Sequence, residues 1–309
     1  MSRDSIPAQN PDSGGSPNAP VLFVHIPKTA GTTLFGIAAS IHGRMPGIVD
    51  RRKVFHIPLD WNEPDDLSPE VVETMERRAE SLRYVSGHCT VGFREYLPED
   101  TRMITMLRDP VSRVVSAYSN IRRDPGNGYH RAVGGSTLEE ILEARSIPEL
   151  DNGQVRRLAG VRPDAGPTDR SHLDLAIDHV DHQIAAVGFT ERFDESFQLF
   201  RAELGWPRRG YLPWNTAPIA AREAPKPPGL LALIAERNTF DVELHAHAAR
   251  RFDARIAELG AGFEAEVERA RRFNSGWYRP WHRFGVVPFR AAKRKAMSIR
   301  RGIPSRKST

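Results

Sequence analysis

Residues 28–33, Lys-Thr-Ala-Gly-Thr-Thr, combine a cation, a glycine and hydroxyl groups in a pattern that suits an anion. They follow VLFVHI (21–26), a short β-branched apolar run typical of a buried strand. They precede a stretch, 34–41, in which apolar residues recur at helical spacing. A loop that enters a helix presents unpaired N–H groups, and the helix dipole adds partial positive charge. We therefore predict that this loop binds a phosphate or similar group, with Lys28 supplying a full charge and Gly31 allowing close approach of the backbone.

The loop differs from the usual nucleoside-triphosphate loop, whose pattern is G-x-x-x-x-G-K-[ST]. The first glycine is missing, and Gly31 is followed by Thr32 instead of lysine. No apolar strand ends in an obvious aspartate that would hold magnesium. These differences argue against a P-loop kinase or ATPase, which remains an alternative hypothesis together with a non-catalytic nucleotide-binding protein.

A second anion site is predicted after the apolar run RMITML (102–107). Arg108 follows this run, and Asp109 and Pro110 are suited to cap and begin a helix. One face of that helix is formed by Val111, Val114, Val115 and Tyr118, and another by Ser112, Ser116, Ser119 and Asn120. Arg108 can clamp a phosphate, and Ser116 can donate a hydrogen bond to the same group.

Other strands and helices alternate along the chain. Strands are expected at 83–88 and 184–189. Helices are expected from Ser68-Pro69, from a capping box at Ser136–Glu139, from Ser171, over 193–204, over about 229–259 and over 263–273. This alternation predicts an α/β fold, a P-loop-like three-layer sandwich with a central parallel sheet flanked by helices. In such sheets ligands bind at the carboxyl ends of the strands, so the loops after Ile26, Gly87 and Leu107 should share one edge.

Several segments, in the order in which they occur, resemble the sulfotransferases that use 3′-phosphoadenosine 5′-phosphosulfate (PAPS) as donor. PKTAGTT (27–33) resembles their 5′-phosphosulfate loop, and TMLRDPVSRVVSAY (105–118) is similar to their 3′-phosphate motif. Three further segments resemble the carbohydrate branch that contains the heparan and uronyl 2-O-sulfotransferases: YVSGHCTVGF (84–93), DNGQVRRLAG (151–160) and VGFTERFDESFQLF (187–200).

The resemblance implies a role for each residue of the two anion sites. Lys28 would neutralise the bridging oxygen as its bond to the transferred group breaks, since sulfuryl transfer, like phosphoryl transfer, depends on positioning and charge stabilisation. Arg108 and Ser116 would hold the 3′-phosphate, which distinguishes PAPS from ATP. The remaining loop residues would hold the 5′-phosphate: Thr29, Ala30, Gly31, Thr32 and Thr33. The resemblance implies no metal.

The resemblance also implies a general base. In the family a histidine after the second strand takes this role within a pattern like G-H-x-x-x-x-F, and His88 occupies that place in SGHCTVGF. Histidine, with an ordinary pKa near ~6.5, can accept a proton at neutral pH. His25 is expected to be structural, and His56 is a reserve candidate for the base.

Gln154, Arg156 and Arg157 lie in one of the family-like segments. Two interpretations are equally open: they face the acceptor or the nucleotide, where the two arginines would select an acidic sugar, or they are structural. The predicted acceptor is a saccharide, a glycolipid or a hydroxylated small molecule, and no nucleic-acid partner is expected.

The composition predicts one domain between two tails. The first 20 of the 309 residues are rich in Pro, Ser, Gly and Asn and are expected to be disordered, and the sulfotransferase domain should span 21–285. From Phe284 onward there are eight Lys or Arg and no Asp or Glu, so without them the net charge of +5 would become −3. The tail 286–309 is expected to be a solvated terminus, with contact to an acidic membrane or polymer as the alternative, whereas the body is not a broad surface for polyanions.

The sequence also suggests where the protein resides. A single cysteine, Cys89, excludes an internal disulfide framework and fits a reducing compartment. The N-terminus lacks the apolar core of a secretory signal, and no apolar run approaches the length of a membrane span. We therefore expect a cytoplasmic bacterial enzyme.

Overall fold

A parallel sheet of five strands forms the centre of the molecule. The structure is a computed structural model that describes residues 19–42, 50–62, 68–211 and 226–278. The strands are β1 (Val21–Val24), β2 (Val54–Asn62), β3 (Tyr84–Cys89), β4 (Arg102–Leu107) and β5 (Ile184–Phe189). Their order is β2-β3-β1-β4-β5, and every neighbouring pair is parallel. The predicted α/β fold with a central parallel sheet is confirmed.

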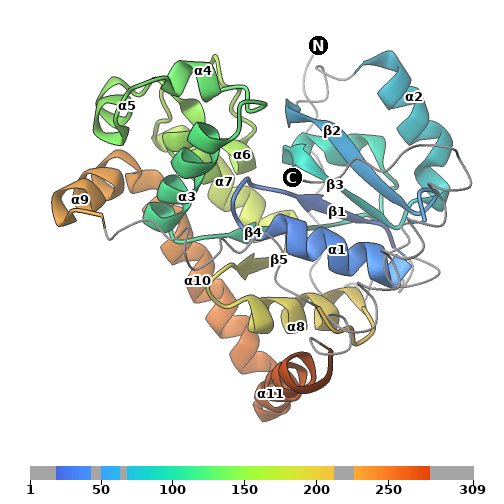
Figure 1. Cartoon of the computed structure of the whole chain (residues 1–309). Helices are drawn as coiled ribbons and strands as arrows, with labels where there is room; N and C mark the ends of the chain where they lie inside the picture. Colours follow the sequence, from blue (N-terminus) through green and yellow to red (C-terminus); the bar gives the residue numbers. More distant parts are fainter. Residues whose placement is uncertain (1–18, 43–49, 63–67, 212–225, 279–309) are drawn as a thin grey trace, which may run out of the picture.

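Helices cover both faces of this sheet. The α-helices are α1 (Gly31–His42), α2 (Pro69–Arg78), α3 (Pro110–Arg123), α4 (His130–Val133), α5 (Leu138–Ala144), α6 (Gly153–Ala159), α7 (Arg170–His182), α8 (Phe193–Leu204), α9 (Pro228–Arg237), α10 (Thr239–Leu259) and α11 (Ala261–Phe273). Short helical turns are η2 (Ala79–Ser81), η3 (Val91–Tyr96), η4 (Pro148–Leu150) and η6 (Asn274–Tyr278). Figure 1 shows α1 and α8 on one face of the sheet and α6 and α7 on the other, with the long α10 crossing its β5 edge.

The sheet positions the candidate residues because its strands all point the same way. Val24 of β1 is in register with Gly87 of β3 and with Thr105 of β4. The loops after these three strands therefore emerge at one edge, as the sequence predicted. The four residues of β1 are all buried, which explains their uninterrupted apolar character.

A second apolar cluster supports α3 from outside the sheet. It joins α3 to α5 and α9 through side chains that include Val114, Ile141 and Ile234, all at most 3% exposed. This packing holds α3 by one face and leaves the face that carries Ser116 and Asn120 half-buried beside the loop after β1.

Several element boundaries agree with the sequence and others do not. The strand 102–107, the strand 184–189 and the helix that ends at Gly205 are confirmed. The capping box uses Thr137 and Glu140, one residue after the predicted pair, and α7 is capped by Asp169, not by Ser171. Strand β2 was not predicted, because VFHIPLDWN contains a proline and polar residues and lacks the apolar run of a central strand.

The predicted long helix over 229–259 is two helices, α9 and α10, which meet at Asn238. The Asn238 side chain is buried, accepts a hydrogen bond from Asn152 N at 2.8 Å and donates to Ile234 O at 2.9 Å. These contacts stabilise a break that the helical periodicity does not reveal.

Most of the predicted N-terminal tail and all of the basic tail at 286–309 lie outside the described residues. Within the part of the chain that is described, no helix is both long enough and apolar enough to cross a membrane.

Candidate active site

The loop between β1 and α1 has the backbone geometry of an anion-binding nest. Lys28 and Ala30 adopt positive φ angles of 71° and 64°, which non-glycine residues rarely do. Alternation of such residues turns successive N–H groups toward one point, and the N-terminal end of α1 adds the positive end of the helix dipole. Strained backbone of this kind costs about 1–3 kcal/mol per residue and clusters at functional sites. The geometry agrees with the predicted anion loop.

Lys28 and Arg108 meet at this loop. The Arg108 guanidinium donates from Nη1 to the carbonyl oxygen of Lys28 at 3.2 Å. The Lys28 ammonium donates to Oδ1 of Asn120 on α3 at 3.2 Å. The loop, the end of β4 and the polar face of α3 therefore converge, although 80 and 92 residues separate the two pairs.

The electrostatics of this convergence favour an anion. Burial, with Arg123 and Arg108 as neighbouring charges, lowers the pKa of Lys28. Burial is also the main cause that lowers the pKa of Arg108. The Arg108 Nε is buried without a hydrogen-bond partner among the described residues, and the carboxylate oxygen of Glu191 with which it pairs is 3.9 Å away. An anion between these cations would relieve their repulsion and supply the missing acceptor.

Ser116 lies one helical turn before Asn120 on α3 and is half-buried. Residues four apart share a helix face, so Ser116 is on the side of α3 that contacts Lys28. Its predicted role beside Arg108 remains a prediction that this placement allows.

His88 is brought to the same edge by β3. Its ring lies against the ring of His25, with centroids 4.6 Å apart and an angle of 54° between the planes. Burial, followed by the nearby His88 and His56, lowers the pKa of His25 well below its ordinary value, so the His25 ring is neutral at neutral pH. That His25 is structural stays a prediction, and its ring lies directly against that of His88.

Gly31 has a different reason to be glycine from the one that the sequence suggested. A Cβ at this position would lie 1.9 Å from Nε2 of His25. The absent side chain therefore makes room for the His25 ring beneath the start of α1. In the same loop, Thr29 is buried and its hydroxyl donates to Ile26 O at 2.7 Å, so this hydroxyl closes the turn and does not project outward.

The Gly31→Ala variant should show this packing directly. We expect its free energy of unfolding to fall by about 1–3 kcal/mol, because the new methyl group must displace His25 or the loop. Urea denaturation monitored by circular dichroism would measure the change. Gly262→Ala is the matched control, since Gly262 is in α11 and a methyl group added there would meet nothing within 4 Å. An equal stability of both variants would contradict the assigned packing.

Gln154, Arg156 and Arg157 do not face a substrate. All three are at most 2% exposed. Arg156 is held by Asp151, with Nη2 3.1 Å from Oδ2, and by Gly166 O at 2.5 Å. The two arginines are therefore not placed to select an acidic sugar, because their guanidinium groups are in the interior and already bind protein acceptors.

Two residues at the site were not singled out by the sequence. The sequence placed Asn120 on the polar face of α3 and gave it no role, yet its side chain accepts a hydrogen bond from the Lys28 ammonium. Arg123, one turn further along α3, adds to the effect of burial in lowering the pKa of Lys28. In the sequence, the spacing of Ser116, Asn120 and Arg123 shows that they share one face of a helix. That this face meets Lys28 could be learned only from the structure.

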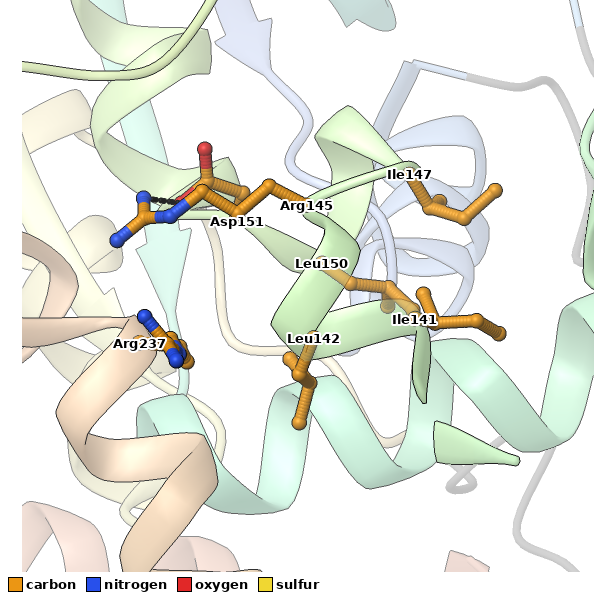
Figure 2. A pocket seen from close by; sticks show the side chains of 7 residues that line it. All are labelled: Ile141, Leu142, Arg145, Ile147, Leu150, Asp151 and Arg237. Atoms are coloured by element: carbon orange, nitrogen blue, oxygen red, sulfur yellow. Dashed lines mark hydrogen bonds and ion pairs between the residues drawn. The ribbon is translucent and has the colours of Figure 1, made fainter. Parts of the chain in front are cut away.

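The pocket drawn in Figure 2 lies elsewhere. Its apolar wall comes from α5, η4 and the turn between them, and the Arg145–Asp151 pair and Arg237 border it. None of the candidate residues described above lines this pocket. Among residues 19–42, 50–62, 68–211 and 226–278, no three His, Cys, Asp or Glu side chains gather as metal ligands.

No curated protein matches the chain significantly. The mouse sulfotransferase SULT7A1 complexed with PAP is 18% identical, with a TM-score of 0.37, over 64% of this chain and 63% of that one. A sulfotransferase from Alicyclobacillus acidocaldarius is 17% identical, with a TM-score of 0.39, over 76% of this chain and 96% of that one. The chain thus spans less than two thirds of the mouse enzyme.

The family profile described as "Sulfotransferase family" matches residues 15–169, just over half of the chain. This range contains the loop at Lys28, the histidine at the end of β3 and the Arg108–Ser116 segment, which are the parts that the fold brings to one edge. The chain therefore belongs to the sulfotransferase family.

Proposed function

We propose that this protein is a PAPS-dependent O-sulfotransferase that transfers the sulfuryl group to a hydroxyl of a carbohydrate or related acceptor. The observation that carries the proposal is the contact between the Lys28 loop and Arg108, at 3.2 Å. It brings a nest for one phosphate within the reach of a single nucleotide from an arginine whose Nε makes no hydrogen bond to the described residues. The neutral His25 and the adjacent His88 lie beside this pair of sites.

The residues fit a donor with two separate anionic groups. The N–H groups of the loop and the Lys28 ammonium suit the 5′-phosphosulfate end. Arg108 Nε, which makes no hydrogen bond to the described residues and has only a 3.9 Å ion pair with Glu191, suits the 3′-phosphate together with Ser116 of α3. Burial and the neighbouring Arg123 and Arg108 lower the pKa of Lys28. The negative charges of such a donor would lie beside these cations and offset their repulsion.

Lys28 acts on the leaving side of the reaction. As the S–O bond to the 5′-phosphate breaks, the electron pair goes to the phosphate oxygen, and the ammonium stabilises the negative charge that develops there. Asn120, the hydrogen-bond acceptor of Lys28 in this structure, would hold the ammonium in the orientation needed.

His88 acts on the acceptor side. The acceptor oxygen forms the new bond to sulfur as its proton passes to the imidazole, so the products are the sulfate ester, PAP and a protonated His88. The motifs between 84 and 200 support an acceptor of the type used by the carbohydrate 2-O-sulfotransferases. We also propose that the protein resides in the cytoplasm and that its basic tail, 286–309, contacts an anionic membrane.

Calorimetric titration with PAP and with adenosine 5′-phosphate tests the two-site arrangement. The wild-type protein should prefer PAP, because only PAP has a 3′-phosphate. In Arg108→Met we expect the affinity for PAP to fall about 10- to 100-fold, the value of one charge-assisted hydrogen bond, while the affinity for adenosine 5′-phosphate changes little. Arg83→Met is the matched control, since Arg83 precedes β3 at the opposite edge of the sheet.

Two results would contradict the proposal. One is a wild-type protein that binds ATP with magnesium more tightly than PAP, which would favour a kinase. The other is an Arg108→Met variant that weakens both nucleotides equally. Transfer of radiolabelled sulfate from PAPS, screened over saccharides, glycolipids and small hydroxylated compounds, then identifies the acceptor.

A further inference from the structure

We propose that helix α6 positions both halves of the active site, Gln154 by fixing Arg108 and Arg157 by fixing His88. The inference deepens the proposed function and rests on it for the roles of Arg108 and His88. Gln154 and Arg157 are thus positioning residues that touch neither donor nor acceptor. They project from one short helix to the ends of two different strands.

Gln154 makes a two-way hydrogen-bonded pair with the backbone of Arg108. Its Oε1 accepts from Arg108 N at 2.9 Å, and its Nε2 donates to Arg108 O at 3.0 Å. The Gln154 side chain is fully buried, so water does not compete for these groups. The residue that follows β4 is thereby fixed where its side chain leaves the sheet.

Arg157 reaches the other strand end. Its Nη1 donates to the carbonyl oxygen of His88, and its Nη2 lies 3.6 Å from Oε2 of Glu149. His88 is the last residue but one of β3, directly before the chain turns into η3. A fixed carbonyl at this point sets the direction in which the His88 side chain leaves the strand.

Helix α6 is itself held rigidly from behind. Asp241 of α10 accepts from the backbone N–H of Gln154 at 3.1 Å and of Val155 at 2.8 Å. Arg113 of α3 pairs with Glu149 at 2.9 Å. The Arg113 guanidinium also packs against the start of α6, since a Cβ on Gly153 would lie 2.7 Å from Arg113 Nη2. Gln154 and Arg157 therefore share one anchored helix.

Arg156 shows that burial of an arginine in α6 is not sufficient for this role. It is nearly as buried as Arg157, but its partners are Asp151 and Gly166, neither of which belongs to a strand. Buried ion pairs contribute little net stability compared with apolar side chains of similar size. Gln154 and Arg157 therefore hold the backbone of Arg108 and His88 in place, whereas Arg156 contacts neither residue.

The test compares Gln154→Leu, Arg157→Lys and the matched control Arg156→Lys in the full-length protein. In Gln154→Leu we expect the affinity for PAP, measured by calorimetry, to fall at least about tenfold, because displacement of a binding group is costly. In Arg157→Lys we expect the affinity for PAP to stay and kcat to fall about 10- to 100-fold, measured with the acceptor found in the screen. The ring signals of His88, observed by NMR in histidine-labelled protein, should shift in Arg157→Lys alone.

The control decides between positioning and a general loss of structure. Arg156→Lys should destabilise the protein like Arg157→Lys without changing PAP affinity or the His88 signals. Equal effects of both lysine variants on His88, or unchanged PAP affinity in Gln154→Leu, would overturn the inference. If Gln154→Leu does not fold, Gln154→Glu, which keeps the shape and loses the donor to Arg108 O, takes its place. A wild-type protein that binds no PAP would sink the proposed function, whereas unmoved His88 signals in Arg157→Lys would sink the inference alone.

Discussion

In the His88→Asn variant we expect kcat for sulfate transfer to fall by about 10²–10⁴-fold, the usual contribution of a positioned general base. Asparagine retains a polar side chain of similar size but cannot accept the proton of the acceptor hydroxyl. The affinity for PAP should be unchanged, because the groups that bind the donor come from Lys28 and Arg108. Steady-state kinetics with labelled PAPS, together with PAP calorimetry, would separate the two effects.

Two other histidines make this experiment decisive. His182→Asn is the matched control, since its side chain is 61% exposed and pairs with Asp178 on the surface of α7. His56→Asn tests the reserve candidate, whose Nδ1 lies 3.3 Å from Oγ of Ser86 on the neighbouring strand. If His56→Asn lost kcat and His88→Asn did not, the base would be His56 and the assignment of His88 would be wrong.

The Asp241→Ala variant should lose about 3–5 kcal/mol of unfolding free energy, because it breaks a buried ion pair and leaves Glu149 as the carboxylate that still pairs with Arg113. Asp241 and Arg113 are both 0% exposed, with 3.6 Å between Oδ2 and Nη2. The truncation also removes the acceptor of two backbone N–H groups at the start of α6. Burial raises the pKa of Asp241, and Arg113 opposes this rise, so the carboxylate depends on its cation.

Urea denaturation would measure this loss, and an exposed ion pair provides the contrast. Asp174 pairs with Arg170 at 3.1 Å on the surface of α7, where both side chains are 62% exposed. Asp174→Ala should leave the unfolding midpoint almost unchanged, since solvent screens such a pair. A comparable loss in both variants would mean that the buried pair contributes no more than a surface pair.

Much of the fold could be predicted from local patterns. The strands at 102–107 and 184–189 and the helices after Pro110 and Phe193 were recognised because their signals are contained within a few residues. A short apolar run, a capping aspartate with proline and a terminal glycine each act through neighbours in the chain. The edge strand β2 and the break at Asn238 were missed, because distant partners stabilise them.

The candidate site divides in the same way. The loop at Lys28 and the arginine after β4 were proposed from residue type and from their places at strand ends, and the histidine in β3 was proposed from the family resemblance. Gly31 was proposed to let the backbone approach an anion, which stays a prediction, and the His25 ring that also requires glycine there could not be foreseen. One interpretation placed Arg156 and Arg157 in contact with the substrate because both are charged. Their partners inside the protein, among them Asp151 and Glu149, cannot be recognised from the sequence.

Local sequence was enough to specify the alternation of strands and helices, the place of the Lys28 loop between a strand and a helix and the order of the family-like segments. These properties depend on backbone propensity, periodicity and side-chain chemistry, which act over a few residues. The packing of the whole chain was needed to bring Lys28 to Arg108 and Asn120, to place His25 between Gly31 and His88, and to turn α6 inward. Such contacts join residues up to about ninety positions apart, and their geometry follows from strand order and core packing, which no local pattern specifies.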